Sequence, residues 1–298
     1  MRSLVPAKDG VHVGIDVGGT LVRTITRVDG GNPGEFAIHE RPADYEVFLA
    51  AVVAWIGEPV LGIGIGLPGR VAGGRSLWVP NVPYLTDRAL ADDVSRRVGA
   101  PVTLANDAQC ALLAELRSGA AQDGMNVVLV SIGTGIGGAV AYGGRLVRGA
   151  HGTAGAFGWL PAQADDAGTV AAERERGPWE RRASGSALQR LAREAGVVGA
   201  RLTVPPDEVT DALMHRYLDD LAPGLAAIAS TFDPNRILLS GGVADLLRWY
   251  LPELRSRILA QASPVARDVE IRVAQHGAAA GAVGASYLAA EGEGAFLS

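Results

Sequence analysis

Short apolar runs alternate with longer amphipathic segments along the whole chain. Residues 11–17, VHVGIDV, form a first apolar run, and residues 21–28, LVRTITRV, follow it after a Gly-Gly-Thr turn. Apolar runs of this length bounded by glycine are typical of strands, so the two segments predict a β-hairpin. We expect a third strand near residues 35–40 and an amphipathic helix at residues 45–57.

Strands and helices continue to alternate to the end of the sequence. Further strands are predicted at residues 60–69, 101–107, 126–132, 136–142, 236–240 and 269–275. Helices are predicted at residues 87–99, 108–119, 185–196 and 207–232, after the Gly-Gly pair at 241–242, and at residues 278–292, with a polar stretch at 162–177. This alternation indicates an α/β fold.

One strand–turn–strand pattern occurs twice. The segment VGIDVGGTLVRT is matched later by LVSIGTGIGGAV, and each places a threonine beside glycines between two apolar strands. A chain of 298 residues is long enough for two domains. We therefore expect each of two domains to contribute one glycine-rich hairpin, with the cleft between the domains as the ligand site.

The composition narrows the possible functions. The formal net charge of −5 gives no electrostatic reason to expect nucleic acid or an anionic membrane as a partner. The single cysteine, Cys110, excludes an intramolecular disulfide, and residues 1–10 lack the apolar core of a signal peptide. No uncharged apolar run approaches the roughly 18 residues of a membrane span. We expect a soluble, cytoplasmic protein.

The two glycine-rich turns are candidate phosphate-binding sites. Residues 16–20, DVGGT, and 133–138, GTGIGG, present several backbone N–H groups with no bulky side chain in the way. Either turn alone is also explained as an ordinary hairpin connection. Two copies favour a nucleotide clamp. Asp16, at the end of the first strand, could hold Mg²⁺ through water.

Asn106 and Asp107 stand where a predicted strand ends and a helix begins. Such residues commonly cap helices, because their side chains accept hydrogen bonds from the free N–H groups of the first turn. Alternatively, Asp107 is a general base that takes the proton of a substrate hydroxyl as its oxygen attacks a phosphorus atom. The residues alone leave both interpretations open.

Other positions have simpler interpretations. Gly241-Gly242 suits either a tight connection or the close approach of a purine. Cys110 is expected to be a buried helix residue. The five histidines show no close metal-ligand spacing, and the charge cluster ERERGPWERR, residues 173–182, is typical of a solvated segment, except for Glu180.

Together these motifs resemble the ROK family (repressor, open reading frame, kinase) of sugar kinases, within the actin-like ATPases. The resemblance spans nearly the whole chain and is carried by GIDVGGT, GIGLPG, Pro80-Asn81, AND at 105–107, IGTGIGGA, RGAHGTAG, ERRASG and LLSGGVA. It implies an α/β fold of two domains, the actin-like ATPase (ribonuclease H-like) fold, with ATP and Mg²⁺ in the interdomain cleft. The implied domains are a small one over residues 1–106, against which a C-terminal helix near 281–298 packs, and a large one over residues 107–280.

The resemblance also assigns roles to individual residues. Asp107 matches the catalytic base, and Asn106 matches a contact to a sugar hydroxyl. The positions matching the nucleotide site are Asp16, Gly18, Gly19, Thr20, Gly133, Thr134, Gly135 and Gly137, with Gly241 and Gly242 beside the adenosine. The expected acceptor site comprises Gly69, Asn81, Asn106, Asp107, His151, Ala156, Trp159 and Glu180.

The stretch GAHGTAGAFGWL, residues 149–160, departs from the family pattern G-E-x-G-H. Ala156 and Trp159 replace the glutamate and the histidine, which reach sugar hydroxyls in the family, where the histidine also binds zinc; His151 is the only ionisable residue left in the stretch. The family's C-x-C-G-x-x-G-C zinc loop should precede Glu180, and no cysteine stands there. Structural zinc needs about four N or S ligands, so none is predicted.

These replacements change the expected acceptor. An unpaired buried hydroxyl costs about 1 to 3 kcal/mol, which makes glucose a weaker candidate. Trp159 could pack on a ring face, and Ala156 leaves room for a different substituent. We hypothesise phosphorylation of a primary hydroxyl of an aminosugar or C7-cyclitol. If a neighbouring loop restores the contacts, the acceptor is a common hexose, as in glucokinases.

Two other function classes remain as alternatives. The family includes sugar-responsive repressors with an N-terminal DNA-binding segment, but only fifteen residues precede Asp16 and the chain is acidic. A non-catalytic sugar binder is disfavoured because Asp107 and both phosphate turns are intact. Family members are commonly dimers, so a homodimer is an open expectation, as is the use of donors other than ATP.

Overall fold

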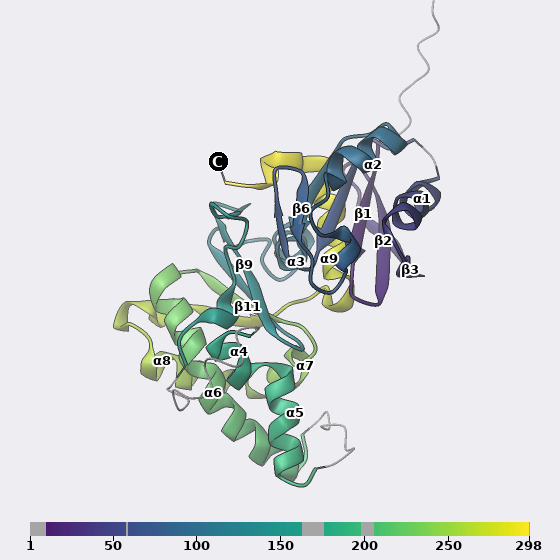
Figure 1. Ribbon diagram of the computed structural model, residues 1–298. Coiled ribbons are helices and arrows are strands. Elements are labelled where there is room, and N and C mark those ends of the chain that lie inside the picture. The colour runs from purple at the N-terminus through teal and green to yellow at the C-terminus, as the bar shows by residue number, and fades with distance from the viewer. Residues whose placement is uncertain (1–9, 58, 163–175, 198–205, 298) are drawn as a thin grey trace, which may run out of the picture. The chain divides into compact units, whose positions relative to one another are not determined.

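The computed structural model of the protein describes residues 10–57, 59–162, 176–197 and 206–297. The contacts divide the chain into two compact units: residues 1–122, 145–154 and 278–298 form the first, and residues 123–144 and 155–277 form the second (Figure 1). Residues 107–122, expected in the second domain, thus group with the first unit. The reason is that helix α3 (Asp107–Ser118) packs along helix α9 (Ala280–Glu291).

The sheet of the first unit has the strand order β3–β2–β1–β4–β7. Strands β1, β2 and β3 form an antiparallel meander, and β4 and β7 run parallel to β1. The bounds are β1 (Val11–Val17), β2 (Leu21–Val28), β3 (Pro33–Glu40), β4 (Gly62–Leu67) and β7 (Val102–Asn106). The hairpin and the third strand expected from the sequence are confirmed.

Helices cover both faces of this sheet. On one face, Val13 and Ile15 of β1 pack in a buried core with residues of α1 (Tyr45–Ile56) and α2 (Leu90–Val98). On the other face lie α3 and α9, which contact β4 (Figure 1). The ribbon of β5 (Arg70–Ala72) and β6 (Arg75–Trp78), followed by the 3₁₀ turn η1 (Pro83–Leu85), was not predicted from the sequence.

Helix α9 lies unusually close to the sheet because glycines face it. A Cβ atom at Gly14 would lie 2.2 Å from the carbonyl oxygen of Ala282, and one at Gly64 would lie 1.9 Å from that of Ala285. Any side chain at these two positions would push the helix away. In β1 and β4, valine and isoleucine therefore pack in the core on one face of the sheet, and the glycines between them allow α9 to lie close to the other face.

The sheet of the second unit contains β9 (Ile136–Tyr142), β8 (Val127–Ile132), β11 (Arg236–Ser240) and β12 (Glu270–Val273), adjacent in that order. Strands β8 and β9 form the second glycine-turn hairpin, and β11 and β12 run parallel to β8. The short β10 (Arg145–Leu146) belongs to the first unit, where Leu146 bridges to Phe296.

Helices surround the second sheet. They are η2 (Phe157–Trp159), α4 (Pro178–Ala183), α5 (Gly185–Glu194), α6 (Glu208–Phe232), α7 (Ala244–Leu247), η3 (Arg248–Tyr250), α8 (Leu251–Gln261) and η4 (Pro264–Asp268). Two further 3₁₀ turns, η5 (Gly277–Ala279) and η6 (Gly292–Ala295), flank α9. None of the helices in the described ranges combines the length and the apolarity that a membrane span requires.

The interpretation of residues 173–182 as a solvated segment is wrong for its second half. Residues 173–175 lie outside the described residues, but residues 178–182 are helical in α4, and Trp179 is only 1% exposed. The indole packs against Gly224 of α6, and its Nε1–H donates to the carbonyl of Asp220 at 3.1 Å. The apolar contact with α6 fixes this helix, while its charged residues remain partly exposed.

Candidate active site

Three parallel strands bring predicted nucleotide-site and acceptor-site residues of the first unit to one edge of its sheet. Strand β1 ends beside Asp16, β4 leads into Gly69, and β7 ends at Asn106. The register pairs Asp16 with Gly66 and Leu67 with Asn106. Ligands of open α/β sheets commonly bind outside the carboxyl ends of the strands, and that is where these side chains lie.

Direct contacts hold the loops at this edge together. A Cβ atom at Gly19 would lie 3.4 Å from Cβ of Asn81, so the first glycine turn lies against the predicted sugar-pocket asparagine. The Nδ2–H₂ of Asn106 donates to the carbonyl of Gly69 at 2.9 Å. Gly69 has φ +135°, and a Cβ there would lie 2.1 Å from the carbonyl oxygen of Trp78. Only glycine fits that position.

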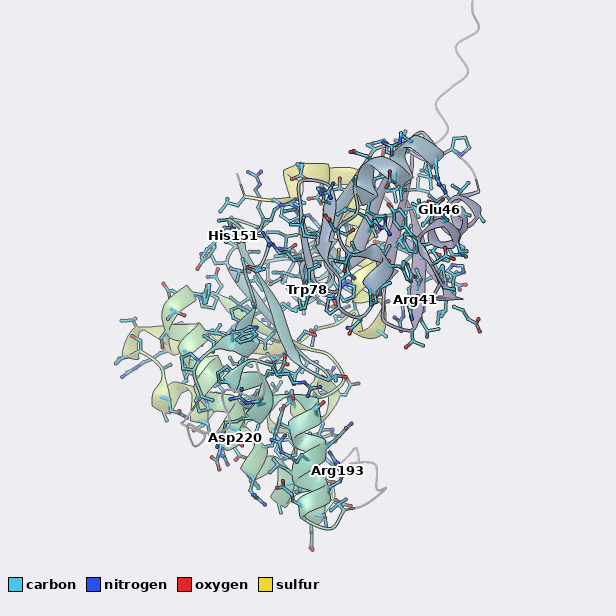
Figure 2. The ribbon with its side chains drawn as sticks, in the orientation of Figure 1. Arg41, Glu46, Trp78, His151, Arg193 and Asp220 are labelled. Atoms are coloured by element: carbon cyan, nitrogen blue, oxygen red, sulfur yellow. The ribbon has the colours of Figure 1, made fainter. Side chains whose placement is uncertain are left out.

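The stretch GAHGTAGAFGWL is divided between the two units. His151 belongs to the first unit, whereas Ala156 and Trp159 belong to the second. The carbonyl of His151 accepts a hydrogen bond from Nε of Arg70 at 2.7 Å, and its side chain is exposed. Figure 2 labels His151 and the exposed Trp78 among the side chains of the first unit.

Asn106 caps helix α3. Its Oδ1 accepts from the backbone N–H of Ala108 at 2.9 Å, and the side chain of Gln109 accepts from the N–H of Asn106 at 3.1 Å, which completes a capping box. The helix-cap interpretation is therefore confirmed for Asn106. Asp107 is the first residue of the helix, and one of its carboxylate oxygens also accepts from the N–H of Ala108.

Asp16 and Asp107 form a pair of carboxyl groups with unusually high proton affinity. Burial raises the pKa of Asp107 to about 6, and the hydrogen bond from Ala108 opposes the shift. Burial also raises the pKa of Asp16 to about 6; the negative charge of Asp107 adds to this, and the positive charge of Arg23 opposes it. Carboxyl groups with a pKa near the working pH are suited to accept protons in catalysis.

Arg23 is a component of this edge that the sequence analysis missed. Its guanidinium lies 3.8 Å from the carboxylate of Asp16, which it faces across the β1–β2 hairpin. Its buried Nε has no hydrogen-bond partner among the described residues. Asp16 pairs with Arg23 because the N–H of Gly18 bonds to the carbonyl of Leu21, which leaves only Gly19 and Thr20 in the turn. The strand bounds predicted from the sequence place Val22 opposite Asp16 instead, so this neighbour was not predicted.

Cys110 lies behind the carboxyl pair. It is a buried residue of α3, as predicted, and its sulfur would lie 3.1 Å from a Cβ at Gly66. Burial raises the pKa of the thiol, and the charges of Asp16 and Asp107 raise it further. The thiol is therefore protonated near neutral pH and is a poor nucleophile.

The first residues of helix α5 are hydrogen-bonded to the second glycine turn. The N–H of Gly133 donates to the carbonyl of Gly135 at 3.0 Å, and the carbonyl of Gly133 accepts from the N–H of Gly185 at 2.8 Å. The hydroxyl of Ser186 donates to the carbonyl of Thr134 at 2.8 Å. These contacts use the carbonyl groups of Gly133, Thr134 and Gly135.

The Gly241-Gly242 pair lies at the same strand edge as this turn. Strands β8 and β11 are parallel, and they end beside Gly133 and Gly241 respectively. Gly241 has φ +87°, and a Cβ there would lie 2.5 Å from the carbonyl oxygen of Ile132. The second unit thus brings the second glycine turn and the Gly241-Gly242 pair to one edge of its sheet, whereas the other nucleotide-site residues, Asp16 and residues 18–20, lie in the first unit.

The replaced family positions are Ala156 and Trp159, beside and within η2. Trp159 is 59% exposed, whereas Phe157 between them is buried and packs edge-on against Phe232. The carboxylate of Glu180 accepts from the N–H of Ile136 at 2.9 Å. The indole of Trp159 is therefore available for contact with a ligand, and the stretch is anchored through Phe157.

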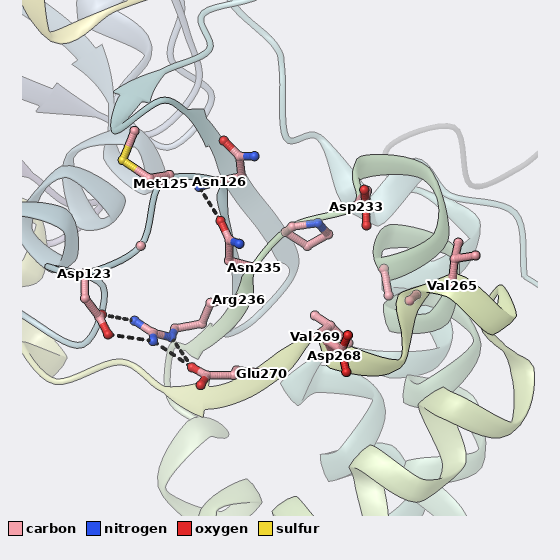
Figure 3. A pocket seen from close by; sticks show the side chains of 14 residues that line it. Asp123, Met125, Asn126, Asp233, Asn235, Arg236, Val265, Asp268, Val269 and Glu270 are labelled. Atoms are coloured by element: carbon pink, nitrogen blue, oxygen red, sulfur yellow. Dashed lines mark hydrogen bonds and ion pairs between the residues drawn. The ribbon is translucent and has the colours of Figure 1, made fainter.

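A polar pocket of about 500 Å³ lies at the opposite edge of the second sheet. It is found where β8, β11 and β12 begin, and Figure 3 shows the guanidinium of Arg236 in it between the carboxylates of Asp123 and Glu270. Nearby, the side chain of Asn235 accepts from the backbone N–H of Asn126 at 3.0 Å. These groups bond mainly to one another, and the pocket lies away from the glycine turn.

Asp16 is suited to a hydrated Mg²⁺ ion. Its raised pKa shows that the neighbouring protein groups do not fully compensate its buried charge, and a divalent cation would do so. Within the described ranges, no cluster of three or more histidine, cysteine, aspartate or glutamate residues could hold a metal ion by itself. A magnesium ion at Asp16 would therefore depend on water and nucleotide oxygens for its other ligands.

Both units contain a sheet extended by a glycine-turn hairpin, and this is the actin-like ATPase fold of sugar kinases. The model of the ROK family matches residues 12–292, and the chain belongs to this family. The fold and the family expected from the motifs are thus confirmed.

Known relatives support this placement. A glucokinase of Streptomyces coelicolor is 30% identical over 318 aligned positions, covering 95% of this chain and 98% of that protein. An N-acetyl-D-glucosamine kinase of Pectobacterium carotovorum is 31% identical, covering 76% of this chain and 79% of that protein. The crystal structure of a ROK family glucokinase from Streptomyces griseus, in complex with glucose and AMPPNP, has a TM-score of 0.75 at 29% identity, covering 95% of this chain and all of that one.

Proposed function

We propose that this protein, a ROK-family sugar kinase, transfers the γ-phosphoryl group of ATP to a primary hydroxyl of a hexose-like acceptor. The observation that carries the proposal is the position of Asp107. This carboxyl group stands at the strand edge that also holds Asp16, Gly69 and Asn106, and its pKa is raised to about 6.

Asp107 is the proposed general base. The acceptor hydroxyl gives its proton to Oδ2 of Asp107 as the hydroxyl oxygen attacks phosphorus, and the bond between phosphorus and the bridging oxygen of ADP breaks. The hydrogen bond from Ala108 fixes the other oxygen, so the carboxylate is oriented before substrate binds. The capping role of Asn106 and the catalytic role of Asp107 are therefore compatible.

The two glycine turns are the proposed triphosphate-binding elements. Gly18, Gly19 and Thr20 belong to the first unit, and the turn at residues 133–137 belongs to the second. Backbone N–H groups of such turns bind phosphate oxygens, and the nearby N-terminus of α5 adds positive potential. When bound at Asp16, Mg²⁺ would neutralise part of the phosphate charge. Arg23 contributes a further positive charge.

The proposed acceptor is an aminosugar or a C7-cyclitol. The positions of the family's glutamate and histidine are held by Ala156 and Trp159, which cannot make the same charged hydrogen bonds. The exposed indole of Trp159 suits contact with a ring face. Asn81 in the first unit and Glu180 in the second are the further residues to which acceptor contacts are assigned. Relatives named glucokinase and N-acetyl-D-glucosamine kinase support phosphorylation of a hexose, so glucose is the direct competitor.

The test is coupled ADP release over a panel of hexoses, N-acetylated hexosamines and cyclitols. Asp107→Asn should lower kcat about 10²- to 10⁴-fold with any active acceptor, because it removes the base. Asp44→Asn, at the N-cap of α1 in the same unit, is the matched control and should keep activity. Full activity in Asp107→Asn would refute the base, and no acceptor-dependent turnover by wild type would refute the kinase proposal.

A further inference from the structure

The carboxylate of Glu180 lies directly beneath the second glycine turn. Its Oε2 accepts from the N–H of Ile136 at 2.9 Å, and a Cβ atom at Gly135 would lie only 2.5 Å from the same oxygen. A Cβ at Gly158 would lie 3.1 Å from it. The carboxylate thus fills the space that side chains at these two glycines would occupy.

The helix that carries Glu180 is firmly anchored. Its neighbour Trp179 is buried against Gly224 and bonded to the carbonyl of Asp220. Two residues further on, the guanidinium of Arg182 pairs with the carboxylate of Asp220 at 2.9 Å. Glu180 is therefore held at a fixed position in the second unit before any ligand binds.

This contact determines which way the turn presents its backbone. The turn is also bonded to Gly185 and Ser186, so Glu180 supplies a third fixed point, at the residue where strand β9 begins. A hydrogen bond from N–H to a carboxylate is among the stronger ones in proteins. A loop that is bonded at three points loses little conformational entropy when an anion binds to it, and its affinity for the anion is therefore higher.

We propose that Glu180 is a positioning residue for nucleotide, holding the turn at residues 133–137 in its anion-binding shape through Oε2. This role rests on the proposed function, in which the turn binds the triphosphate. It is separate from the acceptor contact assigned to the same residue, because that contact would use Oε1. Loss of the carboxylate therefore weakens nucleotide binding even in the absence of acceptor.

The test is calorimetric binding of ADP with Mg²⁺, without acceptor. Glu180→Ala should raise the Kd for ADP about tenfold, in line with the loss of one charged hydrogen bond. Glu180→Gln should change it less than about threefold, because the amide oxygen can still accept from Ile136. Gln189→Ala, at an exposed position of α5 in the same unit, is the control and should leave both the melting temperature and the Kd unchanged.

The outcomes separate this inference from the proposed function. If Glu180→Ala binds ADP like wild type and only the KM for the acceptor rises, the positioning role is overturned. If wild-type protein itself binds no ADP, the proposed function fails first. Should Glu180→Ala not fold, Glu180→Asp replaces it, since the side chain shortened by one carbon cannot keep the contact with Ile136 and should weaken ADP binding.

Discussion

Gly281 of helix α9 lies directly against the carboxylate of Asp16: a Cβ atom at Gly281 would lie 2.5 Å from Cγ of Asp16. Gly281→Ala must therefore displace the carboxylate, and we expect kcat/KM to fall at least about tenfold. Alanine favours helix by about 1 kcal/mol over glycine, so the loss should not come from unfolding of α9. Steady-state kinetics beside Gly294→Ala, where a Cβ would meet nothing within 4 Å, check this. Equal activity of both variants would contradict it.

The pH dependence of the reaction should report the carboxyl pair. Because the pKa values of Asp16 and Asp107 are raised to about 6, the base is protonated below that pH and ionised above it. We expect kcat/KM to rise about tenfold per unit as pH increases toward 6, and to level off above it. Initial rates between pH 4.5 and 8.5 measure this, and a profile that stays flat down to pH 5 would contradict it.

The buried negative charge of Asp107 should destabilise the folded protein. Its folded pKa, about 6, exceeds the ordinary 3.8, so the folded state binds the proton more tightly. The stability due to this group is therefore present below pH 4 and is lost as pH rises through 6. Asp107→Asn should raise the free energy of unfolding by about 1 to 3 kcal/mol at pH 8, and by little at pH 4. Urea titrations of both proteins at pH 4 and pH 8 measure the free energy of unfolding. A larger gain in stability at pH 4 than at pH 8 would contradict the prediction.

Gly224 should be essential for the anchoring of α4. A Cβ atom there would lie 2.1 Å from Cε2 of Trp179, which is fully enclosed. Alanine would normally stabilise a helix interior by about 1 kcal/mol, but overpacking here should exceed that gain and destabilise the protein by about 1 to 3 kcal/mol. Thermal unfolding beside Thr231→Ala, on the exposed side of α6, measures the difference. A stabilised Gly224→Ala variant would show that the indole can move.

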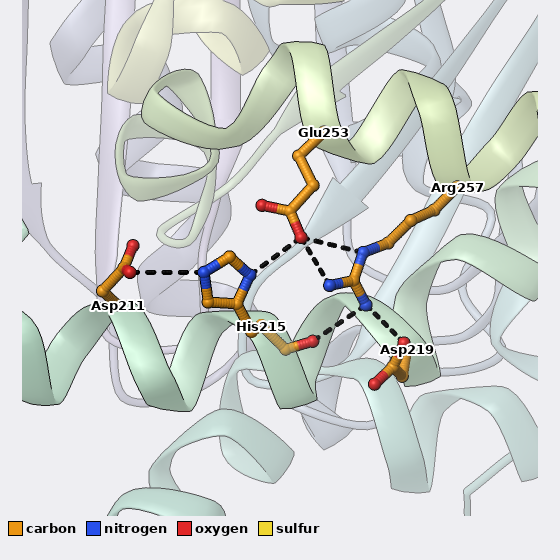
Figure 4. A network of polar contacts seen from close by, with 5 residues as sticks. All are labelled: Asp211, His215, Asp219, Glu253 and Arg257. Atoms are coloured by element: carbon orange, nitrogen blue, oxygen red, sulfur yellow. Dashed lines mark hydrogen bonds and ion pairs between the residues drawn. The ribbon is translucent and has the colours of Figure 1, made fainter.

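His215 joins α6 to α8 in a network of charges (Figure 4). Its Nδ1 lies 2.8 Å from Glu253 and its Nε2 lies 3.2 Å from Asp211, while Arg257 bonds to Glu253 and Asp219. The hydrogen bond with Glu253 is the main cause that raises the pKa of His215, and the ring also packs edge-on against Tyr250.

The stabilisation from His215 is complete below pH 6.5 and is lost as pH rises through the folded pKa, because protonation strengthens both contacts. Since the ring is largely exposed, solvent screening limits the effect to about 0.5 kcal/mol. His215→Gln should therefore lower the melting temperature slightly at pH 5.5 and hardly at pH 8.5. When the same comparison is made in a Glu253→Gln background, the effect of His215→Gln on the melting temperature should depend less on pH. If His215→Gln lowers the melting temperature equally at pH 5.5 and pH 8.5, protonation of His215 is not the cause.

Periodicity allowed most of the fold to be predicted, because the buried strands are apolar and bounded by glycine. It failed at α4, since Trp179 is buried by contact with Gly224, which is distant in sequence, while its neighbours in the chain are charged. The ribbon β5–β6 was also missed. Its strands are too short to show a pattern.

The positions of the carboxyl and amide side chains at strand ends could be predicted from the sequence, but most of their contacts could not. Asp16 and Asn106 lie at the ends of strands that can be recognised from their apolar sequence, and Asp107 directly follows one of them. Nothing in the sequence shows that Glu180 bonds to a backbone N–H, because that contact depends on the fold around it. Nor does it show that the stretch from residue 149 to 160 passes from one unit to the other between Ala154 and Gly155.

The placement of α9 has a consequence for biosynthesis. Strand β1 precedes the second unit in the chain, whereas helix α9, which lies on Gly14 and Gly64, follows it. The second unit is encoded between them and can complete its own sheet earlier. The order of synthesis therefore favours a nascent chain in which the second unit folds before the first, because Gly281 of α9 can lie against Asp16 only after the second unit has been synthesised.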